Sequence, residues 1–173
     1  NELTIKKSNV KKFKKYLTSN NKIDLMQMLK DDKFILGYVE DRAYNSYIDE
    51  LLQKYKSNKA MFRRSGADLT KGLLQMLAAN RVDYILEYPT MVKYNKNKHK
   101  IEEEFIQYPI KNASGLIQVY VGCSKSKYGK ELIKKINIII SDEKQSFSNA
   151  YKNWIPIDSV ERYEKAVKMK TRE

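Results

Sequence analysis

The segment "GLLQMLAANRVDYILEYPTMVKY", residues 72–94, joins a helix pattern to a strand pattern that ends on an acid. Its first part spaces apolar side chains as a helix does, and residues 82–86 then form a short apolar run. The run stops at Glu87, which Tyr88 and Pro89 follow directly. An apolar strand with this ending indicates either a solvated strand end or a carboxylate on the rim of a ligand cleft.

Strand and helix patterns alternate on both sides of this segment. Extended runs are expected at residues 34–39, 60–64, 82–86, 105–110 and 116–123. Helices are expected after the first run, where Ser46 and Asp49 have the spacing of a capping box, and after the second. A further helix is expected at 127–141 with Ser126 as its cap. This alternation predicts an α/β fold whose mostly parallel sheet is covered by helices on both faces.

Length and composition describe a globular chain. With 173 residues, 42% of them apolar and 32% charged, the chain has room for one domain or slightly more. No apolar run approaches the roughly 18 residues of a membrane span. No signal peptide is visible at the start, and the first residue is Asn1. We therefore expect a processed protein or a fragment.

The net charge of +13 raises the question of a nucleic-acid partner. Only six of the 34 basic residues are arginine, the residue whose planar fork suits base edges and phosphates. Lysine is concentrated in "KKSNVKKFKKY", residues 6–16, which is either a basic arm or the solvated face of a helix. The sequence predicts no nucleic-acid partner, with a basic nucleic-acid-binding module as an alternative.

Residues and motifs that are common in catalytic sites are scarce in this sequence. One cysteine, Cys123, excludes a cysteine-built zinc site, and the single histidine, His99, lies in a polar stretch. Glycine-rich phosphate loops are absent from the sequence. We therefore predict no catalytic residues, no cofactor and no metal site.

The candidate site lies where the expected strands end, because ligands of open α/β sheets bind beyond the carboxyl ends of the strands. Polar residues follow three of these ends: Arg42 and Tyr44, then Arg64, then Glu87 and Tyr88. Helix starts beside a carboxylate are an arrangement suited to a zwitterion. Alternatively, Arg42 pairs with an aspartate of its own segment. The side chains of Arg64 and its neighbour Arg63 point to opposite faces of a strand, so at most one of them points at the site.

The order of these pieces resembles the second lobe of periplasmic solute-binding proteins, family 3. Three stretches carry the resemblance: "GLLQMLAANRVDYILEYP" at 72–89, "YVGCSKSKYGKELIKKINIII" at 120–140 and "YKNWIP" at 151–156. The stretches "DRAYNSYID", "RVDYILEYP" and "GCSKSKYG" also resemble, in this order, a subgroup of proteobacterial relatives. The resemblance covers roughly residues 31 to 157. It implies a three-layer α/β/α lobe of the type II periplasmic-binding fold, with C-terminal helices that return to an incomplete first lobe.

The resemblance also implies a division of the chain and roles for its residues. Residues 31–141 would be the second lobe, residues 1–30 a segment of lobe one or the hinge, and residues 142–173 helices of lobe one. Glu87 stands where the family has an aspartate that holds the ligand's amino group. Arg42, Tyr44 and Ser46 lie in the segment whose helix start helps to bind the ligand's carboxylate.

These implications predict a periplasmic, monomeric binding protein and not an enzyme. It would capture a small polar solute such as an amino acid in a cleft between lobes. It would deliver the solute to a membrane transporter of the ABC type, or report it as a sensor. Besides the nucleic-acid-binding module, the alternatives are an enzyme on the same fold and an interaction or sensor domain with an empty cleft.

Overall fold

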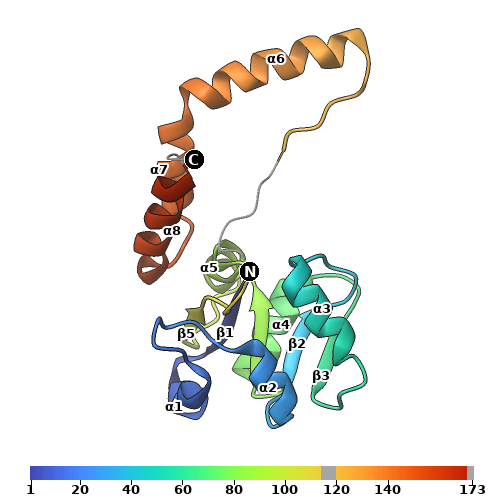
Figure 1. The fold of residues 1–173 in the computed structure, drawn as a ribbon, viewed down its shortest axis with the longest axis vertical. Coiled ribbons are helices and arrows are strands. Elements are labelled where there is room, and N and C mark those ends of the chain that lie inside the picture. Colours follow the sequence, from blue (N-terminus) through green and yellow to red (C-terminus); the bar gives the residue numbers. More distant parts are fainter. Residues whose placement is uncertain (114–119, 171–173) are drawn as a thin grey trace. The chain divides into compact units, whose positions relative to one another are not determined.

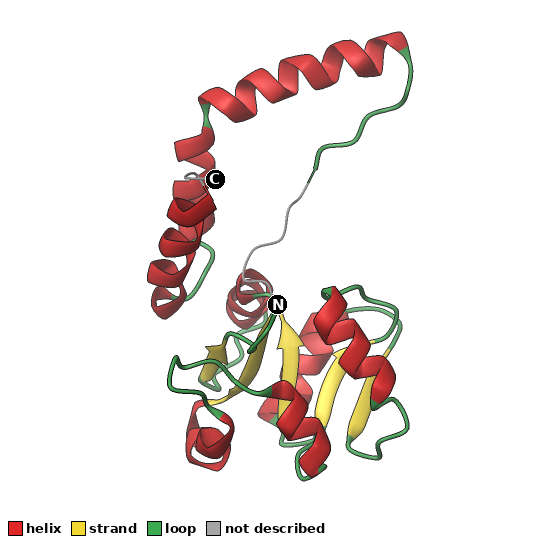
Figure 2. Ribbon diagram, viewed as in Figure 1, coloured by secondary structure: helices red, strands yellow, loops and turns green. Residues whose placement is uncertain are grey.

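The chain is divided into two compact units in a computed structural model that describes residues 1–113 and 120–170. The sheet unit is Asn1–Gly115 and the helical unit is Leu116–Glu173. Part of the extended run expected at 116–123 lies outside the described residues, and residues 120–123 form no strand. The described part of the helical unit consists of helices and loops (Figure 2).

The sheet unit contains a five-stranded sheet in the order β3-β2-β4-β1-β5 (Figure 1). Its strands are β1 (Glu2–Lys6), β2 (Leu36–Val39), β3 (Met61–Arg64), β4 (Tyr84–Glu87) and β5 (Phe105–Tyr108). Strand β2 pairs in parallel with β3 and β4, whereas β1 is antiparallel to both of its neighbours, β4 and β5. Four strands therefore share one direction, and the predicted mixed α/β class with a mostly parallel sheet is confirmed.

Helices cover both faces of this sheet. Successive side chains of each strand point to opposite faces, and both faces carry apolar side chains that must be buried. The helices of the sheet unit are α1 (Val10–Phe13), α2 (Leu25–Asp31), α3 (Ser46–Lys54), α4 (Leu69–Ala78) and α5 (Pro89–Lys98). One face buries a cluster to which α1, α2 and α3 contribute, including Phe13, Met28 and Leu51. The other buries a smaller cluster in which Ile85 meets Leu73 and Leu77 of α4.

The N-terminal residues belong to the core of the sheet unit. Leu3 and Ile5 of β1 are fully buried, and the register of β1 against both β4 and β5 places it inside the sheet. The structure thus has no boundary between compact units at residue 30 or at residue 141, since its division lies between Gly115 and Leu116. The assignment of residues 1–30, 31–141 and 142–173 to the lobes of a larger protein stays a prediction.

The lysine-rich segment at residues 6–16 folds as three short helical pieces rather than as a free arm. Helices η1 (Lys7–Asn9) and η2 (Lys14–Tyr16) flank α1. Phe13 and Tyr16 are each only 1% exposed, whereas Lys11 and Lys14 are exposed. The lysines therefore form the solvated side of a segment that is anchored by its aromatic residues.

The start of α6 (Lys127–Asp142) agrees with the sequence prediction, whereas the start of α3 differs from it. The predicted cap of α6 is confirmed, because the side chain of Ser126 accepts a hydrogen bond from the backbone of Gly129. In α3, however, the side chain of Asn45 accepts from Ile48 at 2.9 Å, so Asn45 and not Ser46 is the N-cap. The predicted capping box was therefore wrong, since the extended backbone that a cap requires occurs one residue earlier.

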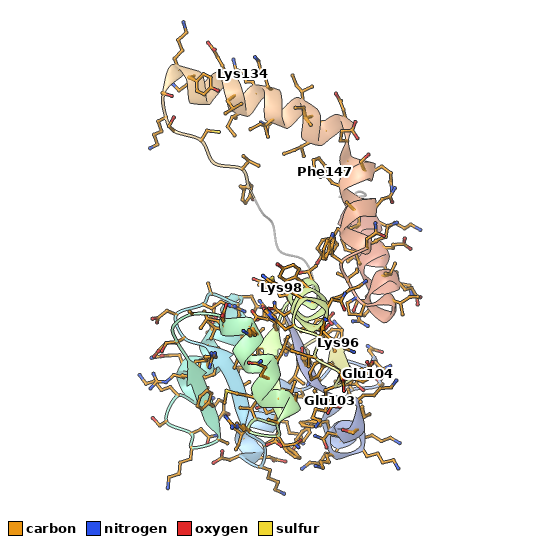
Figure 3. The ribbon with its side chains drawn as sticks, turned by 180° about the vertical axis from the view of Figure 1, so that it is seen from behind. Lys96, Lys98, Glu103, Glu104, Lys134 and Phe147 are labelled. Atoms are coloured by element: carbon orange, nitrogen blue, oxygen red, sulfur yellow. The ribbon has the colours of Figure 1, made fainter. Side chains whose placement is uncertain are left out.

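Two ion pairs tie the segment before β5 to the rest of the sheet unit. Figure 3 labels both of the glutamates and one of the lysines, Lys96. Lys6 forms an ion pair with Glu103 at 2.7 Å and also donates to the carbonyl of Ala78 at 3.0 Å. Lys96 of α5 pairs with Glu104. Because Ala78 is the last residue of α4, Lys6 satisfies one of the carbonyls that a helix end leaves unpaired.

The helical unit contains α6 (Lys127–Asp142), α7 (Lys144–Lys152) and α8 (Ile157–Lys170). The ring centroids of Tyr151 in α7 and Tyr163 in α8 lie 4.8 Å apart. Lys152 of α7 donates a hydrogen bond to Glu164 of α8 at 3.0 Å. The apolar side chains of α6 stay largely uncovered, with Ile139 54% exposed. The sequence predicted α6 at residues 127–141, and the family resemblance implied further helices at the C-terminal end.

Candidate functional site

Three neighbouring parallel strands end at the same edge of the sheet. Strand β2 ends at Val39 between β3, which ends at Arg64, and β4, which ends at Glu87. Each of the three is followed by the segment that leads into a helix: α3, α4 or α5. The geometry expected from the sequence for a ligand edge is therefore present (Figure 1).

Glu87 is the most deeply buried charged group at this edge. Its side chain has 0% exposed surface. Oε1 accepts hydrogen bonds from Nη1 of Arg42 at 2.7 Å and from the backbone of Tyr88 at 2.9 Å. Oε2 accepts a hydrogen bond from the hydroxyl of Thr70 at 2.6 Å. Both oxygens are thus satisfied, which a buried carboxylate requires.

The alternation of β4 explains why an acid is buried here. Tyr84 and Leu86 face the larger apolar cluster, whereas Ile85 faces the cluster of α4. Glu87 falls on the side of Ile85, so its side chain meets the first turn of α4, where Thr70 lies. The sequence pattern marked the strand end, but only the position of α4 brings Thr70 to the carboxylate.

Arg42 reaches Glu87 from the segment that follows β2. Its side chain is 21% exposed, so it lies between the buried carboxylate and the solvent. Desolvation acts to lower the pKa of Arg42, but the hydrogen bond and the charge of Glu87 outweigh it, and the pKa is raised. Arg42 therefore stays a cation at this edge. The alternative partners within its own segment are not used, since Asp49 accepts from the backbone of Tyr44 instead.

The remaining predicted residues have different surroundings. Tyr44 is 3% exposed, and its hydroxyl accepts from the backbone of Val39 at 2.8 Å, so it packs in the core beneath Arg42. Burial raises the pKa of Tyr44 to about 12. Tyr88 contributes its backbone N–H to Glu87. Ser46 is exposed at the start of α3 and makes no side-chain hydrogen bond within the described residues.

Arg64 lies on the α4 side of the sheet, whereas Arg63 does not. In the ladder Arg64 is opposite Val39, which faces α4, and Arg63 is opposite Tyr38, which faces the other cluster. A Cβ placed on Gly72 would lie only 2.2 Å from Cζ of Arg64, so the guanidinium rests directly on the first half of α4. The sequence analysis missed Thr70 and Gly72, because neither belongs to an apolar or charged pattern.

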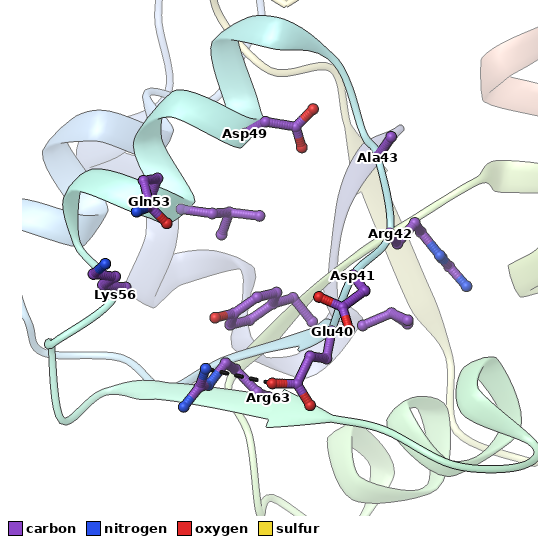
Figure 4. A pocket seen from close by; sticks show the side chains of 11 residues that line it. Glu40, Asp41, Arg42, Ala43, Asp49, Gln53, Lys56 and Arg63 are labelled. Atoms are coloured by element: carbon purple, nitrogen blue, oxygen red, sulfur yellow. Dashed lines mark ion pairs between the residues drawn. The ribbon is translucent and has the colours of Figure 1, made fainter.

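An open pocket of about 420 Å³ lies on the opposite side, between the end of β2 and helix α3 (Figure 4). Its lining includes Tyr38, Glu40 and Lys56. Glu40 pairs with Arg63 across its rim at 3.4 Å. Arg42 also belongs to the pocket lining, but its side chain extends away from Glu40 and Arg63 (Figure 4) and pairs with Glu87, so the pocket and the Glu87 cluster adjoin at Arg42.

In the parts of the chain that the structure describes, no three His, Cys, Asp or Glu side chains are grouped so as to hold a metal ion. No helix in the same residues is long and apolar enough to cross a membrane.

Comparison with known proteins gives a likeness at the level of structure. No family model matches the sequence, and no curated protein matches it. The periplasmic binding protein XoxJ from Methylobacterium extorquens AM1 superposes with a TM-score of 0.61 over 89% of this chain, at 9% sequence identity. The chain has a periplasmic-binding-protein fold.

The chain matches only part of the length of these periplasmic binding proteins. The chain covers 65% of XoxJ, which is less than two thirds of that protein. An ancestral arginine-binding protein bound to glutamine is similar with a TM-score of 0.47 and 15% identity over 88% of this chain and 58% of that one. The periplasmic sensor of the Borrelia burgdorferi hybrid histidine kinase Hk1 gives a TM-score of 0.36 and 20% identity, over 62% of this chain and 38% of that chain.

Proposed function

We propose that this chain is the second lobe, with its returning helices, of a periplasmic or extracellular solute-binding protein similar to family 3. It would capture a small polar solute such as an amino acid for ABC import or for sensing. The observation that carries the proposal is the polar cluster of Arg42, Thr70 and Glu87 at the carboxyl ends of parallel strands. In this fold class such an edge is where ligands bind.

The hydrogen bonds of Glu87 limit how a solute can bind to this cluster. Contact between Glu87 and a cationic group, as the sequence resemblance implies, requires that the solute displace Arg42 from Oε1. The anionic end of a solute can approach Arg42 directly, because that side chain is partly exposed. We propose that Arg42 serves the anion, and that a cationic group reaches Glu87 when the cleft closes by a hinge motion.

The same contacts favour binding over catalysis. A general acid or base must present an exchangeable site to the substrate, and both oxygens of Glu87 are occupied by groups of the chain itself. The lysine-rich segment is part of a folded surface anchored by Phe13 and Tyr16, which supports a solvated face rather than a nucleic-acid arm.

A thermal-shift screen of the full chain tests the proposal with amino acids, polyamines and short peptides, and with duplex DNA for comparison. A ligand at 100 times its Kd adds about 2.7 kcal/mol, which at this chain length raises the melting temperature by roughly 5–10 °C. We expect such a shift with one solute, and its loss in Glu87→Gln when each variant is compared with its own ligand-free state. Glu50→Gln, an exposed glutamate of α3, is the matched control. A shift with DNA alone that fades as salt rises would overturn the proposal.

A further inference from the structure

Three arginine side chains lie at the ends of β2 and β3, and two of them have a counter-ion. Arg42 pairs with Glu87 at 2.7 Å, and Arg63 pairs with Glu40 at 3.4 Å. The third, Arg64, has no ion pair or side-chain hydrogen bond within the described residues. Its Nε is buried and unpartnered among them. Of these three arginines, Arg64 is therefore the one that takes part in no ion pair of the described residues. Asp41, the acidic residue after Glu40, lines the pocket at the end of β2.

Gly72 determines where that charge lies. A Cβ at Gly72 would be 2.2 Å from Cζ of Arg64 and 2.3 Å from both Nε and Nη2. Real side chains do not approach so closely, so any other residue at position 72 would displace the guanidinium. The absence of a side chain thus seats Arg64 flat against α4.

The first half of α4 connects this guanidinium to the Glu87 cluster. Thr70, which donates to Glu87 at 2.6 Å, stands two residues before Gly72 on the same helix. Glu87 and Arg64 both project to the α4 side of the sheet, from the two strands that flank β2. Because Arg42 already neutralises Glu87, this side of the edge keeps the charge of Arg64. The α4 side of the edge thus presents a guanidinium without an ion pair, to which an anion can bind.

We propose that Arg64, positioned by Gly72, binds the carboxylate of the solute together with Arg42. This inference rests on the proposed function and narrows its substrate class to solutes that carry a carboxylate. A guanidinium matches a carboxylate with two parallel hydrogen bonds, which a lysine cannot supply. Arg64 is a binding residue in this arrangement, and Gly72 is a positioning residue that acts through it.

The test follows the Nε–H signals of arginine in ¹H–¹⁵N NMR spectra of the full chain during titration with sodium acetate, with sodium chloride at equal ionic strength as reference. We expect the signal of Arg64, assigned by its loss in Arg64→Lys, to shift saturably with acetate. Acetate affinity should fall about tenfold or more in Arg64→Lys, as for the loss of a charge-assisted hydrogen bond. Arg63→Lys should leave the affinity unchanged.

Gly72→Ala provides a second variant that should remain folded. The group that its methyl would meet is the far end of a flexible side chain, and alanine favours a helix interior more than glycine does. We expect an unchanged circular dichroism spectrum and the same loss of the acetate response. Gly122→Ala, where a Cβ meets nothing within 4 Å, is its control. A folded Gly72→Ala variant that responds to acetate as the unchanged protein does would overturn the inference.

The same samples separate this inference from the proposed function. If acetate binds at Arg64 while no solute of the thermal-shift screen binds, the carboxylate site stands and the proposed function fails. If a solute binds the unchanged protein and binds Gly72→Ala equally well, solute capture stands and the role of Arg64 fails.

Discussion

Nη1 of Arg42 lies 2.7 Å from Oε1 of Glu87, a residue 45 positions later in the chain whose side chain is completely buried. This pair joins the segment after β2 to the end of β4. Removing one partner would leave the other charge without its counter-ion, and the burial of Glu87 makes that loss costly. The pair is thus a structural requirement of the candidate site as well as a part of it.

We predict that Arg42→Met lowers the free energy of unfolding by about 3–5 kcal/mol, because the carboxylate of Glu87 stays buried without its cation. The double variant Arg42→Met/Glu87→Leu should recover most of this loss, since no charge then remains buried. Urea denaturation followed by circular dichroism measures both. Arg63→Met is the control, because Glu40 is 38% exposed and an exposed pair contributes less than about 1 kcal/mol. Equal losses in Arg42→Met and Arg63→Met would contradict the buried-pair explanation.

Burial of Tyr44 predicts a loss of stability in alkaline solution. Its folded-state pKa is raised to about 12, above the ordinary value near 10. The contribution is complete below pH 10 and is lost as the pH rises from 10 to 12, because the unfolded chain loses the proton first. A pKa shift of this size lowers the free energy of unfolding by up to about 2–3 kcal/mol over this pH range.

Tyr44→Phe should therefore flatten the alkaline part of the stability curve. The variant should also be less stable at pH 7, because the backbone N–H of Val39 loses its acceptor. Urea midpoints measured between pH 7 and pH 12 give both effects. Tyr128→Phe, at a position that is 72% exposed, should leave the curve unchanged. A Tyr44→Phe curve as steep as that of the unchanged protein would contradict this prediction.

The start of α3 offers a direct comparison between neighbouring residues. Asn45→Ala removes the side-chain acceptor of the Ile48 N–H and should lower the free energy of unfolding by about 1 kcal/mol. Ser46→Ala removes no hydrogen bond of the described residues and should stay within about 0.5 kcal/mol. If Ser46→Ala proved the more damaging change, the cap would lie where the sequence placed it.

The sheet unit should fold without the helical unit. All five strands and both buried clusters lie within residues 1–113. A chain that ends after residue 113 cuts no strand or helix of the described part. We predict a cooperative urea transition and a far-ultraviolet spectrum with both helix and strand. A gradual transition would mean that the sheet unit needs the rest of the chain.

Local periodicity was enough to predict most of the elements. The apolar face of α4, including Leu73 and Leu77, follows from spacing along the chain, as does the Ser126 cap of α6. The ends of β2 and β4 were placed to within three residues. These features depend on neighbours in the sequence, so the printed residues determine them.

The contacts that make the candidate site depend instead on residues far apart in the chain. Nothing in the neighbourhood of Glu87 predicts that Arg42 and Thr70 occupy its oxygens. Likewise, Gly72 matters only because Arg64 of β3 lies against it. The sequence by itself therefore determined the elements and the edge at which polar groups gather. The tertiary structure decided which charges are paired and which are not, because that outcome depends on packing α4 across three parallel strands.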